Sequence, residues 1–449
     1  MRVNKSWKLD PILRKLANKN SSFCNIAKRI VFRLRSSRLL RKIERKFSQN
    51  RRRFGASKRY LFVDVTYVMG CDYKTGVQRV VRAITLELLK LKLQKLTIKP
   101  VYLSDSGCRW HYRYANSWTN QLIGKVDQRF NNKEIQTNPG DVLLIADLTL
   151  TTMVEAQRHG LYEELRTAGV DIAGIVYDIL PLQLPTYFPA IAAKNHRDWL
   201  IAMATISSQF LCISKAVAEE TKAWLCEHQP ESLESLKVDW FHLGADIEQS
   251  QPSLGLPDNL EVLKSQLTGH CNFLMVGTVE PRKGHRQVVA AFDQLLEEGH
   301  PFNLVIVGKE GWMMEDLAMH MQHSKHREQG LFWFSAASDE FLAWLYQHCQ
   351  CLIGASEGEG FGLPLIEAAM NKMPLLIRDI PVFKEVAGEG AAYFSSTEPE
   401  RLATAIKSWE KLFKLGHHPD SSRVKWITWK DSAQQLLIKM NPYFTNKKL

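Results

Sequence analysis

The sequence predicts an α/β protein with two parallel-sheet domains, and three observations support this prediction. Short apolar runs typical of buried strands alternate with helical stretches along most of the chain, a rhythm that favours parallel sheets covered by helices. The 449 residues exceed what one hydrophobic core usually holds and suit two domains of ordinary size. Residues 249–257, rich in Ser, Pro and Gly, indicate a linker between the domains.

The first domain is expected over residues 60–250 and the second over residues 258–415. Apolar runs predict the strands of the first domain at 60–65, 98–103, 141–145, 171–176, 209–213 and 238–242. Runs of the same kind predict the strands of the second at 272–276, 302–308, 331–334, 351–354, 374–377 and 392–394. Beyond them, residues 426–437 have the apolar spacing of a helix.

The most informative stretch is residues 356–369, which read SEGEGFGLPLIEAA directly after the predicted strand at 351–354. Pro364 suits the first turn of a helix, so we expect a helix that begins near Phe361. Glu359 then precedes the first turn and Glu367 lies inside the helix. The carboxyl ends of strands in open α/β sheets are where ligands bind, so both glutamates are candidate site residues.

The composition of this junction suits a sugar nucleotide. Gly358, Gly360 and Gly362 allow close approach of backbone to a ligand, and the N–H groups at a helix start favour a negative charge such as a diphosphate. Ionised Glu359 and Glu367 can accept hydrogen bonds from sugar hydroxyls. The alternative is a capped helix whose acids only complement the helix dipole.

A basic turn lies upstream, in residues 272–286. An apolar strand, a Gly-Thr turn, then Arg282 and Lys283 precede an apolar helical stretch. Arg282 can fork onto phosphate oxygens and Lys283 can add a point charge, which would offset the charge of a leaving diphosphate without a divalent metal. The alternative is a solvated basic turn.

The Glu-x7-Glu arrangement inside EGFGLPLIEA, with the basic turn upstream, resembles the signature of retaining glycosyltransferases of family 4, also called group 1. This family includes sucrose synthases and bacterial mannosyl- and rhamnosyltransferases, and its fold is GT-B, two Rossmann-like domains facing a cleft. The resemblance implies that Glu359 contacts the donor sugar, Glu367 the ribose, and Arg282 and Lys283 the diphosphate. It also places residues 416–449 as a helix that crosses back to the first domain. Further donor-binding residues implied by the motif are Gly360, Phe361, Gly362 and Leu363.

Two places in the first half are further candidates. Thr75 and Gly76 open the segment TGVQRVVR, which resembles a subset of bacterial polysaccharide transferases, and Gly76 would let the chain pass close to the donor phosphate. Thr75 also suits a simple helix cap. Asp178 follows a buried strand and is a candidate for orienting the acceptor or the donor sugar, or for capping its own loop. Many relatives have His-Asp at this place, whereas this sequence has Tyr177.

Charge is concentrated at the start of the chain. Residues 1–59 hold 20 Lys and Arg against Asp10 and Glu44, so the whole net charge of +12 comes from this segment. Within it, apolar residues recur at helical spacing between basic ones, which predicts a basic amphipathic helix. We expect this extension to lie on the anionic inner face of the cell membrane. A solvated extension and a nucleic-acid-binding arm are the alternatives.

Other features narrow the function class. The eight cysteines show no Cys-x-x-Cys spacing, which indicates a reducing cytoplasm without zinc clusters or a disulfide framework. No secretory signal or bilayer-spanning apolar run is evident. The resemblance to the family implies a retaining glycosyltransferase that acts on a surface polysaccharide or lipid-linked glycan, and with the basic turn we expect it to need neither a metal nor a cofactor. Because mannosyltransferases are common among the relatives it resembles, GDP-mannose is the first expectation for the donor, before dTDP-rhamnose and UDP-hexoses.

Two other function classes remain alternatives, beside one enzyme subtype. A catalytically silent sugar-nucleotide or glycan-binding protein would keep the fold without turnover. A scaffold or nucleic-acid binder would act through the basic arm, with salt-sensitive binding. The enzyme subtype is a synthase or phosphorylase with a soluble acceptor, which would not need membrane binding.

Overall fold

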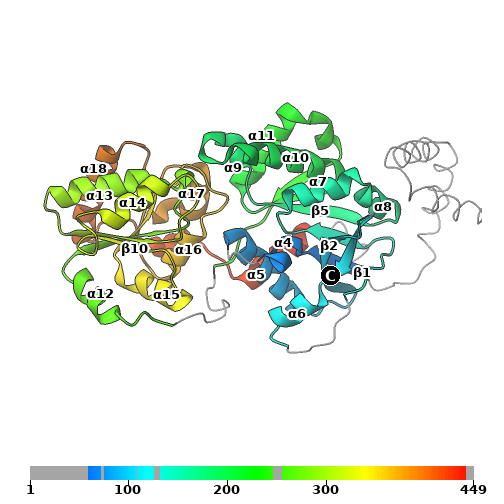
Figure 1. Cartoon of the computed structure of the whole chain (residues 1–449), viewed down its shortest axis with the longest axis horizontal. Coiled ribbons are helices and arrows are strands. Elements are labelled where there is room, and N and C mark those ends of the chain that lie inside the picture. The colour runs from blue at the N-terminus through cyan, green and yellow to red at the C-terminus, as the bar shows by residue number, and fades with distance from the viewer. Residues whose placement is uncertain (1–58, 72–74, 108, 126–131, 246–254, 441–449) are drawn as a thin grey trace, which may run out of the picture. The chain divides into compact units, whose positions relative to one another are not determined.

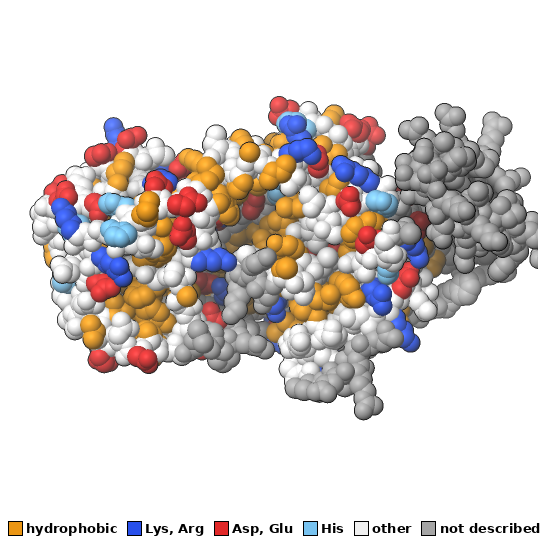
Figure 2. All heavy atoms as spheres, in the orientation of Figure 1, with side chains coloured by type: hydrophobic (Ala, Val, Ile, Leu, Met, Phe, Trp, Pro, Cys, Tyr) orange, Lys and Arg blue, Asp and Glu red, His pale blue; other side chains and the backbone are white. Residues whose placement is uncertain are grey.

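The computed structural model describes residues 59–71, 75–107, 109–125, 132–245 and 255–440. The predicted basic extension, apart from Arg59, lies outside the described residues, as does most of the predicted linker. Among the described residues, no helix combines the length and the apolar character that crossing a bilayer requires. On the face seen in Figure 2, acidic and basic side chains are interspersed over the described surface.

The first sheet has seven strands in the order β3-β2-β1-β4-β5-β6-β7, all parallel except β3, which pairs antiparallel with β2. Its strands are β1 (Arg59–Asp64), β2 (Leu96–Asp105), β3 (Trp110–Tyr114), β4 (Val142–Ile145), β5 (Asp171–Val176), β6 (Gln209–Cys212) and β7 (Lys237–Trp240). Its helices are α4 (Thr66–Gly70), α5 (Gly76–Lys90), α6 (Asn116–Leu122), α7 (Leu150–Arg158), α8 (Leu161–Thr167), α9 (Leu180–Gln183), α10 (Ala190–Ile206) and α11 (Lys215–His228).

The second sheet has six parallel strands in the order β10-β9-β8-β11-β12-β13. Its strands are β8 (Cys271–Val276), β9 (Phe302–Val307), β10 (Leu331–Phe334), β11 (Cys351–Gly354), β12 (Leu375–Arg378) and β13 (Ala392–Phe394). The helices from here to the end are α12 (Leu260–Leu267), α13 (His285–Glu297), α14 (Glu315–His323), α15 (Asp339–His348), α16 (Leu363–Met370), α17 (Pro381–Ala387), α18 (Pro399–Lys414) and α19 (Trp429–Lys439).

Helices cover both faces of each sheet (Figure 1), as the alternating pattern predicts. In the first sheet, Phe62 belongs to a core shared with α7, α8, α10 and α11, while its neighbour Leu61 belongs to a core shared with α5 and α6. Successive side chains of a strand point to opposite faces, so the buried runs feed two apolar layers at once. The prediction of two Rossmann-like α/β domains is thereby confirmed.

Three local predictions need correction. The edge strand β3 was not predicted, because its sequence WHYRY lacks a continuous apolar run. Helix α16 begins at Leu363 and not near Phe361, since Gly362 before it has a left-handed φ of 91° that no helix continues. Helix α19 begins at Trp429 and not at Trp426, because Thr428 caps it in a reciprocal capping box with Asp431.

The last helix, α19, packs against α5 and is hydrogen-bonded to the strands of the first sheet. Gln209 Nε2 donates to the Lys439 carbonyl at 3.1 Å, and Lys439 Nζ lies 2.8 Å from Asp239 Oδ1. Ser432 Oγ donates to the His242 carbonyl at 2.6 Å. The chain therefore returns to the first sheet after completing the second.

Candidate active site

Two neighbouring strand-to-helix junctions of the second sheet build the candidate site. Strand β8 leads through a short 3₁₀ turn, Pro281–Lys283, into α13, and β11 leads through the glycine-rich loop into α16. Strands β8 and β11 are parallel partners, with Cys351 opposite Phe273. Their carboxyl ends therefore meet at one edge of the sheet, which brings the basic turn beside the acidic loop.

Gly284 lets the basic turn pack closely on the segment that follows β11. Its φ of 76° is left-handed, and a Cβ at this position would lie 2.4 Å from the Ala355 carbonyl oxygen. The next residue, His285, is fully buried, and its burial, Lys283 and Arg282 together lower its pKa to about 3. A neutral His285 thus adds no charge behind the two cations of the turn.

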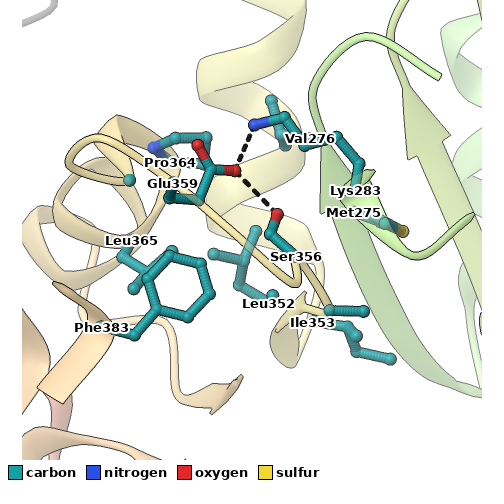
Figure 3. A pocket seen from close by; sticks show the side chains of 13 residues that line it. Met275, Val276, Lys283, Leu352, Ile353, Ser356, Glu359, Pro364, Leu365 and Phe383 are labelled. Atoms are coloured by element: carbon teal, nitrogen blue, oxygen red, sulfur yellow. Dashed lines mark hydrogen bonds and ion pairs between the residues drawn. The ribbon is translucent and has the colours of Figure 1, made fainter. Parts of the chain in front are cut away.

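Glu359 lies at the centre of the site (Figure 3). Lys283 Nζ donates to its Oε1 and Ser356 Oγ donates to the same oxygen at 2.7 Å, while Arg282 Nη1 lies 3.3 Å from Oε2. Burial alone would raise the pKa of Glu359, but Lys283 and then Arg282 outweigh it, so the pKa falls to about 2. Glu359 is therefore ionised at neutral pH although its side chain is only 11% exposed.

Arg282 contacts three acceptors at once. Its Nη2 lies 2.7 Å from Glu280 Oε1, and its Nη1 donates to the Gly358 carbonyl at 3.0 Å and approaches Glu359. Burial lowers the pKa of Arg282, but the negative charges of Glu359, Glu280 and Asp178 raise it by more. The net effect is a raised pKa. Burial raises the pKa of Glu280, against Arg282 and Lys283. These contacts hold the Arg282 guanidinium in one place at the edge of the sheet, with its charge balanced by the neighbouring carboxylates.

Glu367 lies one turn inside α16 and is only 2% exposed. Arg79 Nη1 of α5 donates to its Oε1 at 2.5 Å, and the Tyr346 hydroxyl of α15 donates to its Oε2 at 2.8 Å. Burial lowers the pKa of Arg79, and the charge of Glu367 more than restores it. The cation that balances Glu367 thus comes from the first domain.

The glycine-rich loop approaches the first domain closely. A Cβ on Gly360 would lie 2.2 Å from the Tyr177 carbonyl oxygen, and Ser214 Oγ donates to the Gly360 carbonyl at 2.8 Å. Phe361 is buried, with its ring 5.4 Å from that of His242. In this structure the close approach that the glycines allow is therefore made by the protein itself.

The candidates of the first domain have local partners. Thr75 caps α5 in a reciprocal capping box with Gln78, and no atom of the described residues lies within 4 Å of where a Cβ of Gly76 would stand. Asp178 Oδ1 accepts from the Leu180 amide at 3.1 Å, so this carboxylate does cap its own loop. Tyr177 is buried, and its hydroxyl donates to the Ala146 carbonyl at 2.6 Å, so its ring does not enter the site.

Sequence reasoning missed several residues that hold these groups. Ser356 and Arg79 stand inside the two motifs but were not singled out. Glu385 of α17 accepts from the Lys215 and Ala216 amides at 2.8 Å each, at the start of α11, and lies 2.7 Å from His242 Nε2. Ser356 contacts Glu359 within one loop, so its place in the motif was a usable signal. Arg79 and Glu385 meet their partners only when the two domains are packed together, and local sequence does not show these contacts.

A second set of contacts lies around the loop after β5. Trp312 Nε1 donates to the Tyr187 carbonyl at 2.8 Å, and the Phe188 ring stacks on Trp312 at 5.7 Å. The Tyr187 hydroxyl donates to Glu357 Oε2 at 2.7 Å. Side chains of the first domain thus contact the same loop that carries Glu359.

The cavity beside Lys283 and Glu359 measures about 20 Å³, against the roughly 10–15 Å³ that one water needs. Its lining includes Ser356, Gly362 and Phe383. Any ligand larger than water must therefore displace side chains or separate the segments that meet here.

Residues 267–422 match the family model described as glycosyl transferases group 1. The serotype-specific mannosyltransferase WbdA of Escherichia coli is 42% identical over 392 residues, which cover 86% of this chain and 47% of that protein. This chain is a group 1 glycosyltransferase. The match contains the basic turn, Glu359 of the glycine-rich loop and Glu367 of α16, so the glycosyltransferase signature falls within the matched domain.

Other similar proteins agree with this assignment. The O-antigen chain mannosyltransferase RfbU of Salmonella typhimurium is 31% identical over 141 residues, 31% of this chain and 38% of that protein. The crystal structure of Anabaena Alr3699/HepE in complex with UDP and glucose superposes with a TM-score of 0.58 at 14% identity, covering 86% of this chain and 100% of that one. This likeness confirms the GT-B fold of the glycosyltransferase. The chain spans about half the length of the curated WbdA relatives that it matches.

Proposed function

We propose that this glycosyltransferase moves a mannosyl group from GDP-mannose to a growing polysaccharide of the O-antigen type, with retention of configuration and without a metal ion. The names of its relatives, a serotype-specific mannosyltransferase and O-antigen chain mannosyltransferases, support the sugar and the acceptor class. The geometry around Glu359 supports the donor site. The chain spans about half the length of WbdA, so we propose, and do not transfer directly, the mannosyltransferase activity of the whole WbdA protein.

The observation that carries the proposal is the ionised, buried Glu359 held by Lys283, Arg282 and Ser356. A carboxylate with a pKa of about 2 remains a strong acceptor for sugar hydroxyls throughout the physiological range. Arg282 and Lys283 would also form ion pairs with the donor diphosphate. The site then holds a sugar on its acidic side and phosphates on its basic side.

Glu367 is assigned to the ribose of the donor. Its two oxygens accept from Arg79 and Tyr346, which fix the direction of the side chain. A ribose hydroxyl would have to share or replace one of these bonds. The space that the described residues leave beside Gly76, at the start of the fifteen-residue α5, would receive a phosphate oxygen near the helix N-terminus.

For the chemical step we propose attack on the same face from which the diphosphate departs. The bond between the anomeric carbon and the phosphate oxygen breaks, the bond to the acceptor oxygen forms, and a phosphate oxygen takes the acceptor proton. Arg282 and Lys283 stabilise the charge that grows on the phosphate in the transition state, where preorganised donors have their largest effect. Asp178 is left to orient its loop and, through its charge, Arg282.

Donor entry would involve a rearrangement around Glu359, beside which the cavity measures about 20 Å³. The Arg79–Glu367 pair and the contacts of Tyr187 and Phe188 join the same segments that a sugar nucleotide must reach. We propose that these contacts open and re-form during each turnover. Closure over the substrates would exclude water from the reacting sugar.

Attachment to the inner face of the cell membrane through residues 1–59 completes the proposal. It follows from the sequence pattern alone, and vesicles with and without anionic lipid would test it on the whole chain. Salt-sensitive binding to anionic vesicles is the expected result. Equal activity with and without residues 1–59 on a soluble acceptor would favour the synthase alternative.

The function is tested by mannosyl transfer from GDP-mannose to O-antigen oligosaccharides, with and without EDTA, and by the anomeric configuration of the product. Transfer that survives EDTA and gives the α-anomer from the α-linked donor is expected. UDP-glucose and dTDP-rhamnose serve as competing donors. Binding of GDP-mannose with no transfer to any acceptor would contradict the enzymatic role and favour a silent binding protein.

A further inference from the structure

A groove on the first domain has the composition of a carbohydrate site and lies apart from the donor-binding junctions. It is formed by β3, α7 and α10 and has a volume of about 340 Å³, within the roughly 300–1,000 Å³ of small-molecule pockets. Helices α7 and α10 pack side by side (Figure 1). We propose that this groove binds a neutral oligosaccharide, namely the part of the acceptor chain that extends away from the transfer site.

An aromatic ring is the first feature that fits a sugar. Trp110 begins the edge strand β3 and is only partly buried, so part of its indole faces the groove. The apolar faces of pyranose rings stack on such rings, while the indole keeps a polar N–H. Buried Val154 continues the apolar part of the lining.

The polar groups of the groove include both hydrogen-bond donors and acceptors. Glu155 and Arg158 lie three residues apart on one face of α7, and Asn195 lies on the facing α10. Thr151 and Thr152 add hydroxyls at the first turn of α7. Sugar hydroxyls donate and accept, so they match a wall that mixes carboxylate, amide, hydroxyl and guanidinium groups.

Charge balance selects a neutral ligand. The lining holds two acids, Glu155 and Asp198, and two bases, Arg158 and Lys194. Lys194 Nζ already pairs with Asp198 Oδ2 at 2.9 Å. A groove without net charge gives no attraction to a phosphate backbone or an anionic lipid surface, since those partners need clustered cations.

The topology connects the groove to the sheet edge where the site lies. Asp64, the last residue of β1, pairs with Val101 of β2, while Trp110 pairs with Asp105, beyond the end of β1. Helix α7 starts shortly after β4 ends, at the same edge. The groove therefore begins at the carboxyl edge of the first sheet and leads away from it, as a track for an extended acceptor would.

The proposal rests on the proposed function in taking the ligand to be the acceptor chain and its sugars to be mannose. Calorimetric titration of the full chain with mannose, α-mannobiose and α-mannotetraose tests it, with isomaltotetraose as the comparison sugar. Affinity is expected to increase with mannoside length. Trp110→Ala is expected to weaken tetraose binding about tenfold through lost stacking and lost apolar contact.

Matched variants keep the test decisive. Glu155→Gln changes one exposed group and is expected to weaken tetraose binding about threefold. Trp426→Ala removes an exposed tryptophan outside the groove and should leave binding unchanged. If Trp110→Ala does not fold, Glu155→Gln decides. Absence of tetraose binding in the wild type, or equal binding in wild type and Glu155→Gln, would overturn the proposal.

Titration of GDP-mannose into the same samples separates the two proposals. Normal GDP-mannose binding in Trp110→Ala with weakened tetraose binding supports the groove. Tetraose binding that depends on Trp110, in a protein that binds no GDP-mannose, supports the groove and refutes the proposed donor. Tighter binding of isomaltotetraose than of the mannoside would overturn the assignment of the groove to a mannose chain.

Discussion

The two domains each bury a carboxylate at the carboxyl edge of a sheet, and they treat its charge in opposite ways. Glu359 of the second domain is surrounded by Lys283, Arg282 and Ser356, and its pKa is about 2. Asp64 of the first domain is fully buried, its side-chain partners among the described residues are the Thr66 and Tyr112 hydroxyls, and burial raises its pKa to about 7. Similar depth thus gives a carboxylate that is fully ionised at neutral pH in one domain and a carboxyl that titrates near neutral pH in the other.

The partners of Asp64 explain the difference in role. Its carboxylate accepts from the Thr66 amide at 2.9 Å and from the Tyr112 hydroxyl at 2.8 Å, and nearby Asp147 holds the Val68 amide at 2.7 Å. These bonds fix α4, the helix that precedes α5 and its Arg79. Counter-ions, and not burial, therefore distinguish a group suited to binding substrate from one that holds a loop.

Lys283→Ala should have the largest effect, because it removes one of the two cations that hold the pKa of Glu359 far below that of Asp64. The pKa of Glu359 should rise, and the diphosphate should lose one of its charges. Turnover is expected to fall by at least about 100-fold, the usual effect of losing one preorganised transition-state contact. Steady-state transfer from GDP-mannose measures it, with unfolding midpoints to show that the variant folds.

Glu359→Gln is the companion change and keeps the size of the side chain. A fall in turnover of about the same order is expected, since the amide accepts sugar hydroxyls more weakly than a carboxylate. Glu389→Gln, an exposed glutamate of the same domain, is the matched control and should retain activity. Wild-type rates in both Lys283→Ala and Glu359→Gln would refute the assigned site.

Asp64→Asn tests the pKa of the first-domain carboxyl through the pH dependence of stability. Because the folded pKa of Asp64 is about 7 and its unfolded value is 3.8, the neutral acid stabilises the fold at low pH, and this contribution is lost as pH rises toward 7. The stability difference between wild type and Asp64→Asn should therefore shrink by about 2 kcal/mol from pH 5 to pH 7.

Urea unfolding at several pH values measures this difference. The buried His196, whose pKa is lowered mainly by burial, titrates in both proteins and cancels from the comparison. Above pH 8 the difference should be constant. A difference that does not vary between pH 5 and pH 8 would mean that Asp64 is ionised throughout, like Glu359.

Arg79→Ala tests the third carboxylate, Glu367, whose cation comes from the other domain. Without Arg79 the buried Glu367 side chain loses its contact to the first domain and keeps the bond from Tyr346, so it is held less firmly in place for a ribose hydroxyl. The KM for GDP-mannose is expected to rise about tenfold with a smaller change in kcat. Lys92→Ala, an exposed lysine just beyond α5, is the control; a lower KM in Arg79→Ala would show that the pair obstructs the donor.

Glu385→Gln should have the smallest effect. Burial raises the pKa of Glu385, but His242 and the Lys215 and Ala216 amides outweigh it, so the net direction is downward. The carboxylate therefore stabilises the fold above pH 4.5 and loses this effect as pH falls. A loss of about 1 kcal/mol at pH 7 is expected in thermal unfolding, and no loss would mean that the amide satisfies the same donors.

The sequence predicts most strands because parallel strands buried on both faces are continuous apolar runs, as in VLLI of β4. It does not predict β3, whose WHYRY sequence lies at the sheet edge and mixes ring and polar residues. The predicted helix starts were wrong where a single residue sets the first helical position, as Gly362 does for α16 and Thr428 for α19. Such positions depend on backbone conformation and caps, which periodicity does not contain.

The site divides in the same way. Arg282, Lys283 and Glu359 were predicted together because adjacent strand ends bring two local motifs to one sheet edge. Arg79 and Glu367 are separated by 288 residues, and Glu385 and His242 by 143. These pairs depend on how the two domains pack, and no local pattern encodes that. Their roles, like those of the predicted donor-binding residues, stay predictions.

Calorimetric titration of GDP-mannose, in the presence of EDTA, into wild type and Arg282→Ala tests the proposed donor site. We expect binding that persists with EDTA and weakens by at least about tenfold in Arg282→Ala, because the guanidinium would contact the diphosphate through charge-assisted bonds. Binding that requires a divalent metal, or that is equal in Arg282→Ala, would contradict a donor site built from the basic turn and Glu359.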